Sequence, residues 1–147
     1  MIIYDARHIA NEYTGLGRYS AALLCSILPN LCGEKLLVIL PSCESSNSLY
    51  LYVVDCLQKN KNVHAEVVDI PLFGIKHHFL IGRLNFFKDC YLYIYPHFDV
   101  PISVRSKIIY VVHDTFVLDV PNYLVKHEKI KKLYFWLIHN CLAASKN

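Results

Sequence analysis

Residues 36–40, Leu-Leu-Val-Ile-Leu, form an uninterrupted apolar run, and this run constrains the fold more than any other segment. A strand with water on one face alternates apolar and polar residues, whereas a strand that is apolar throughout is covered on both faces. Strands of that kind are typical of parallel sheets with helices on either side. The run therefore predicts a central strand of a parallel sheet.

Strand and helix patterns alternate along the rest of the chain. Short apolar or β-branched runs predict further strands at residues 1–4, 63–68, 91–95 and 107–112. Apolar residues at helical spacing predict helices at 20–28, 48–57, 77–87 and from 122 to the end. The segment 48–57 is also rich in tyrosine and valine, so a strand is an alternative there. The alternation predicts one Rossmann-like α/β domain over residues 1–147, with a parallel sheet and helices on both faces.

Composition excludes several classes of protein. With 54% hydrophobic and 18% charged residues the chain is globular, and a net charge of +3 without a basic arm or zinc-finger spacing gives no reason to expect nucleic acid. The six cysteines include no CxxC pair, so we expect buried thiols, no metal site and a reducing cytoplasm. No apolar run approaches the roughly twenty residues that cross a bilayer.

Residues 14–19, Thr-Gly-Leu-Gly-Arg-Tyr, lie between the first predicted strand and the first predicted helix. Ligands of α/β proteins bind at such connections. Gly15 and Gly17 permit close approach of the backbone, and the free amides of a helix start favour an anionic or oxygen-rich group. The alternative is that both glycines only make a tight turn.

Polar residues also follow three of the predicted strands. Asp5 ends the first strand, where we expect it to hold the next loop by hydrogen bonds. His97 lies in the loop after the fourth strand, and His113-Asp114 follows the fifth. Right-handed crossovers bring the C-terminal ends of all parallel strands to one edge of the sheet. We therefore expect the glycine segment, the His97 loop and the His113-Asp114 pair to line one cleft.

Three common chemistries do not fit these motifs. A P-loop needs lysine and then Ser or Thr after its last glycine, where this chain has Arg18-Tyr19. A dinucleotide fingerprint needs a third glycine and follows its strand more closely. His113-Asp114 lacks the GxSxG nucleophile motif of α/β hydrolases. The motifs thus exclude ATP hydrolysis by a P-loop and give little support to dinucleotide binding or hydrolysis.

Residues 3–7, Ile-Tyr-Asp-Ala-Arg, followed by 14–19, resemble the opening of family-4 retaining glycosyltransferases of the GT-B class. Residues 95–101, Tyr-Pro-His-Phe-Asp-Val-Pro, and 109–115, Ile-Tyr-Val-Val-His-Asp-Thr, with Pro121 after them, are similar to later landmarks of that family in the same order. The resemblance covers essentially the whole chain but only the N-terminal half of such an enzyme. It implies the N-terminal, acceptor-side domain of a GT-B fold.

The resemblance implies transfer of a sugar from a nucleotide-sugar donor to a glycan or lipid-linked acceptor, with retention of anomeric configuration. The nucleotide-sugar is a substrate, and no cofactor or metal is implied. In that family a second domain carries most of the donor site, including an acidic pair, and this sequence lacks it. We therefore expect a truncated domain or one subunit of a split transferase, inactive alone. The alternative is a non-catalytic Rossmann-like binding or scaffold module.

The resemblance also implies roles for residues of the expected cleft. His113 would be the catalytic residue, close to the transferred sugar; the other interpretation is a hydrogen-bonded core histidine. Asp114 would orient His113 or only cap the following loop. Arg18 would pair with phosphate or acceptor, or remain solvated. The implied substrate-binding set is Gly15, Leu16, Gly17, Arg18, His97 and Asp114.

Two further partners follow from this interpretation. The basic C-terminal helix or the apolar segment 73–87 would contact the inner face of a membrane peripherally. A domain without its second half would also expose an apolar face and self-associate.

Overall fold

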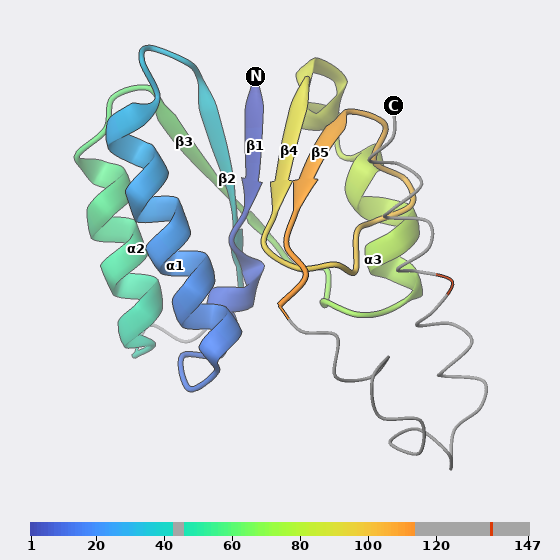
Figure 1. Cartoon of the computed structure of the whole chain (residues 1–147), viewed down its shortest axis with the longest axis horizontal. Helices are drawn as coiled ribbons and strands as arrows, with labels where there is room; N and C mark the ends of the chain where they lie inside the picture. The colour runs from blue at the N-terminus through green and yellow to red at the C-terminus, as the bar shows by residue number, and fades with distance from the viewer. Residues whose placement is uncertain (43–45, 114–135, 137–147) are drawn as a thin grey trace.

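The computed structural model describes residues 1–42, 46–113 and 136. Its centre is a five-stranded sheet whose neighbouring strands all run parallel, in the order β3-β2-β1-β4-β5 (Figure 1). The strands are β1 (Ile2–Asp5), β2 (Leu36–Pro41), β3 (Val63–Val68), β4 (Leu92–Tyr95) and β5 (Lys107–Tyr110). The α/β, Rossmann-like fold predicted from the sequence is confirmed.

Helices pack on both faces of this sheet. The two longer helices cover one face and the third lies over the other (Figure 1). The helices are α1 (Gly15–Ile27), α2 (Ser48–Gln58) and α3 (Ile75–Leu80), and the 3-10 turns are η1 (Arg7–Ala10), η2 (Leu28–Asn30), η3 (Ile81–Arg83) and η4 (Asn85–Asp89). Residues 48–57, for which the sequence allowed either a helix or a strand, form the helix α2. The helix predicted from residue 122 lies outside the described residues.

Each face of the sheet has its own apolar core, because successive strand residues point to opposite sides. Tyr4 and Val38 belong to the core under α1 and α2, whereas Ile3 and Leu37 belong to the core on the α3 side. Every residue of β2 is buried. The apolar run that predicted a doubly covered strand thus occupies one.

The first helix begins earlier than predicted. Thr14 is its N-cap, and the Thr14 hydroxyl oxygen accepts the Gly17 N–H at 3.1 Å. Gly15 and Gly17 therefore lie in the first turn of α1 instead of in the loop before it. The cap formed by Thr14, six residues before the predicted start at residue 20, is the physical reason for the difference.

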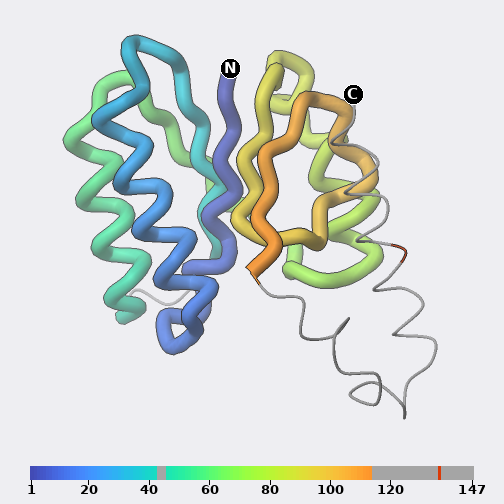
Figure 2. The backbone as a smooth tube through the Cα atoms, in the orientation of Figure 1, coloured from blue at the N-terminus to red at the C-terminus, as the bar shows by residue number. Residues whose placement is uncertain are grey.

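The helix predicted at residues 77–87 is broken into α3, η3 and η4. Leu84 between the two turns has extended backbone angles (φ −62°, ψ 142°). A Cβ on Gly82 would lie 2.3 Å from the Ser103 carbonyl oxygen, and the Gly82 N–H donates to the Ser103 hydroxyl at 2.9 Å. Figure 2 shows the loop before β5 running beside this segment. Packing against a distant loop thus overrides the helical pattern.

We expect Gly82→Ala to destabilise the fold by about 2 kcal/mol, because the new methyl group has to displace backbone atoms of Ser103 and Val104. Chemical unfolding measures this loss. Gly74→Ala is the matched control, since a Cβ there meets nothing within 4 Å. Equal stability of the two variants would contradict the packing described for Gly82.

Candidate functional site at the C-terminal edge of the sheet

Strand β1 ends on a buried ion pair between Asp5 and Arg7, whose exposed fractions are 0% and 1%. Arg7 Nε donates to Asp5 Oδ1 at 2.9 Å and Arg7 Nη2 donates to Oδ2 at 2.6 Å, where the Tyr93 hydroxyl also donates at 2.6 Å. Burial opposes ionisation of Asp5, but the charge and hydrogen bonds of Arg7 outweigh it, so the pKa of Asp5 is lowered. Asp5 therefore holds the loop after β1, as the sequence predicted.

Arg7 also connects β1 to the α3 side of the sheet. Its Nη1 donates to the Ile70 carbonyl at 2.7 Å, and its Nη2 donates to His77 Nδ1 at 3.1 Å. Because that nitrogen accepts, the ring proton is on Nε2, which donates to the Asp99 carbonyl at 2.9 Å. Burial lowers the pKa of His77, and the charge of Arg7 lowers it further. One hydrogen-bonded chain thus anchors the loop after β4.

Four rings gather beside this network, and we call them the edge cluster: His8, Phe73, Tyr95 and His97. The His8 ring centroid lies 5.7 Å from Phe73, 5.5 Å from Tyr95 and 5.3 Å from His97. His8 is only 4% exposed, and its Nε2 has no hydrogen-bond partner in the described part of the chain. A buried nitrogen without a partner is costly, and such atoms are natural positions for a ligand hydroxyl or a water.

The histidines of the edge cluster are neutral near pH 7. Burial lowers the pKa of His8 to about 4 and that of His97 to about 3. His97 Nδ1 accepts the Asp99 N–H at 3.1 Å, which places the His97 ring proton on Nε2. A neutral imidazole offers one donor and one acceptor, which is what a hydroxyl group needs.

The two glycines of α1 have different surroundings. A Cβ on Gly17 would lie 2.5 Å from the Asn11 carbonyl oxygen, and the Gly17 N–H is already bound to its cap, so Gly17 serves packing. A Cβ on Gly15 would meet nothing within 4 Å. The amides of Gly15 and Leu16 precede Arg18, the first residue whose N–H bonds within the helix, and they make no hydrogen bond within the described residues. They are the donors that this helix start offers to a ligand.

His113, just after β5, lies against α1. Its ring is 4.8 Å from the Tyr19 ring, nearly perpendicular to it, and 6.3 Å from the His97 ring. Its Nε2 donates to the Pro96 carbonyl at 2.9 Å, which leaves Nδ1 as the ring nitrogen that can contact a ligand. The three segments expected at one edge of the sheet do lie together there. The roles assigned to their residues stay predictions.

Two other residues that the sequence predicted for the site, Arg18 and Asp114, make no described contact with the edge cluster. Arg18 is exposed, and its Nε donates to the Glu12 carbonyl at 3.3 Å. Asp114 lies outside the described residues. The sequence analysis did not select His8 or Phe73 for this edge. The position of His8 directly behind a strand end was an available signal, but Phe73 belongs to the loop before α3, which that argument does not reach.

No family model, curated protein or solved structure matches the chain. Within residues 1–42, 46–113 and 136, no three or more His, Cys, Asp or Glu side chains are grouped so that they could hold a metal ion. No helix in these ranges has the length and apolar character to span a membrane.

We expect the free energy of unfolding to fall as the pH drops from about 6.5, the ordinary pKa of histidine. Below that pH the unfolded chain binds protons at His8 and His97, whereas the folded chain does not until about pH 4 and about pH 3. Each extra proton in the unfolded state lowers stability by about 1.4 kcal/mol per pH unit.

Chemical unfolding at a series of pH values measures this slope. His8→Phe keeps a ring in place and removes one titrating group, so its slope between pH 6 and about 4 should be smaller. His64→Phe, at an exposed position of β3, should keep the original slope. Equal slopes for all three chains would contradict the buried, neutral state of His8.

Proposed function

We propose that this chain is the acceptor-side domain of a retaining glycosyltransferase of the GT-B class, acting on a nucleotide-sugar donor and a glycan or lipid-linked acceptor. The observation that carries the proposal is the ring contact of His113 with Tyr19 in the second turn of α1, a helix whose first two amides, those of Gly15 and Leu16, have no hydrogen-bond partner among the described residues. The motifs that resemble the family are thus neighbours in space. The resemblance itself supplies the reaction class.

The start of α1 would bind the donor phosphates. Its amides carry the positive end of the helix dipole, and this end favours phosphate oxygens. Arg18 follows within the same turn, is exposed, and has no ion pair with any described residue. The rest of the donor site would come from a second domain, on the same polypeptide or on another.

His113 would be the catalytic residue. Its Nδ1 would accept a hydrogen bond from a hydroxyl of the transferred sugar and so offset the positive charge that develops at the anomeric carbon. Asp114 would orient the imidazole. The role needs no cofactor, since the leaving nucleotide diphosphate is held by the α1 amides.

The edge cluster would bind the acceptor. The neutral rings of His8 and His97 supply donors and acceptors for sugar hydroxyls, and Phe73 supplies an apolar face. The unpartnered Nε2 of His8 would gain a hydrogen bond when a hydroxyl arrives.

We expect Gly15→Pro to weaken binding of uridine or guanosine diphosphate roughly tenfold or more, because proline removes one amide donor to the phosphates. Proline is tolerated at the first helical position, and Thr14 before it already has the extended angles (φ −89°, ψ 145°) that proline favours. Nuclear magnetic resonance titration measures the affinity. Gly15→Ala keeps the donor and should bind as the original chain does. Equal binding by both variants would remove this amide from the donor site.

We expect His113→Ala to lower sugar transfer roughly 100-fold or more in a reaction that includes the second domain, because one stabilising contact to the transition state is lost. The side chain is exposed, so folding should be retained. Transfer of labelled sugar measures the rate, and His64→Ala is the control for an exposed histidine away from the edge. Turnover retained in His113→Ala would favour a non-catalytic binding module.

A further inference from the structure

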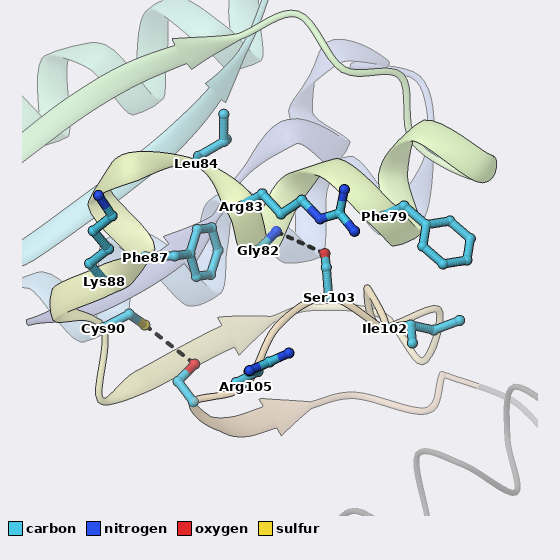
Figure 3. Close-up of a pocket in the computed structure, with 11 residues that line it drawn as sticks. Phe79, Gly82, Arg83, Leu84, Phe87, Lys88, Cys90, Ile102, Ser103 and Arg105 are labelled. Carbon is cyan, nitrogen blue, oxygen red and sulfur yellow. Dashed lines mark hydrogen bonds between the residues drawn. The ribbon is translucent and has the colours of Figure 1, made fainter.

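A concave surface lies on the α3 side of the sheet, away from the edge described above. It is a cavity of about 710 Å³ between the α3–η4 segment and the loop before β5. Figure 3 shows Phe79 and Ile102 at one end, Lys88 and Cys90 at the other, and Arg105 between them. No residue of the edge cluster lines it.

The cavity is strongly cationic. Arg83, Lys88 and Arg105 line it, all three are exposed, and none forms an ion pair with any described residue. None of the described residues in its lining is acidic. Three cations without an acidic partner around one cavity would attract an anionic group, such as a phosphate.

Two serine hydroxyls in the lining are held with their protons available. The Ser103 oxygen accepts the Gly82 N–H at 2.9 Å, and the Ser106 oxygen accepts from Cys90 Sγ at 3.4 Å. Each hydroxyl therefore keeps its own O–H to donate. The close packing of Gly82 on the Ser103 backbone keeps this wall rigid. The cavity thus combines positive charge with positioned neutral donors.

Apolar side chains surround the cationic group. Phe79 and Ile102 line the cavity and are each 48% exposed. Ile75, on the same short helix as Phe79, is 81% exposed. A soluble phosphate would make no favourable contact with these apolar side chains. A lipid, in contrast, presents a phosphate and hydrocarbon chains together.

We propose that this cavity binds the phosphate headgroup of an anionic lipid, with Phe79 and Ile102 inserted at the membrane surface. The proposal stands apart from the transferase assignment, because it uses none of the residues of the C-terminal edge. Arg83 and Arg105 neutralise the phosphate, and the serine hydroxyls complete its hydrogen bonds.

Vesicle flotation of the full chain tests the proposal. We expect it to float with phosphatidylcholine vesicles that contain phosphatidylglycerol and not with phosphatidylcholine alone. R83Q/R105Q should lower vesicle affinity roughly tenfold or more, since each cation at an anionic surface contributes to binding. F79S/I102S should lower it as well. Chemical unfolding shows whether each double variant is folded. If one is not, Lys88→Gln replaces it and should also lower vesicle affinity.

Matched controls come from surfaces away from the cavity. K35Q/K61Q removes two exposed cations, and L51S/Y52S removes two exposed apolar side chains of α2; both should float as the original chain does. Flotation unchanged in the Arg83/Arg105 variant would assign membrane binding to another surface and overturn the proposal. Absence of flotation, with thermal stabilisation by inorganic phosphate alone, would replace the lipid by a soluble anion.

Discussion

The organisation of the edge depends on the buried ion pair between Asp5 and Arg7. Burying two charges costs several kcal/mol for each ion, and their attraction offsets this only when the remaining hydrogen bonds are complete. Here the Tyr93 hydroxyl of β4 donates a further hydrogen bond to Asp5. Arg7 donates its further hydrogen bonds to the Ile70 carbonyl and to His77. These partners come from three different segments. The pair is therefore satisfied only when β1, β4 and α3 meet in this one arrangement.

The same pair lies among rings that burial keeps neutral. Burial is the main cause that lowers the pKa of His8 and His77; the charge of Arg7 lowers it further, whereas the charge of Asp5 opposes this. The rings around the pair are therefore neutral donors and acceptors. Such groups recognise hydroxyl positions and contribute little to holding a phosphate. Affinity for an anion has to come from the start of α1, a few residues further along the chain.

The parallel sheet was predictable because a strand that is buried on both faces has an uninterrupted apolar sequence, as residues 36–40 do. The rule that parallel strands end at one edge then brought His97 and His113 towards the glycine segment. The break in the third helix was not predictable, because it comes from Gly82 packing on Ser103, a contact between distant segments. The sequence does not predict the contacts of Phe73 with His8 and His97 for the same reason. The local sequence pattern thus predicts which residues are buried, whereas the packing of distant segments determines which residues they contact.

The two surfaces are joined by one short rigid segment. His77 in α3 contacts the Arg7 network, and Phe79, on the same helix, lines the cationic cavity. The helix has six residues and so rises about 9 Å, and the packing of Gly82 holds its far end. A headgroup held in the cavity would therefore keep the edge at a constant height above the lipid. A change that loosens Gly82 acts on both surfaces, whereas a change at His113 acts on the edge alone.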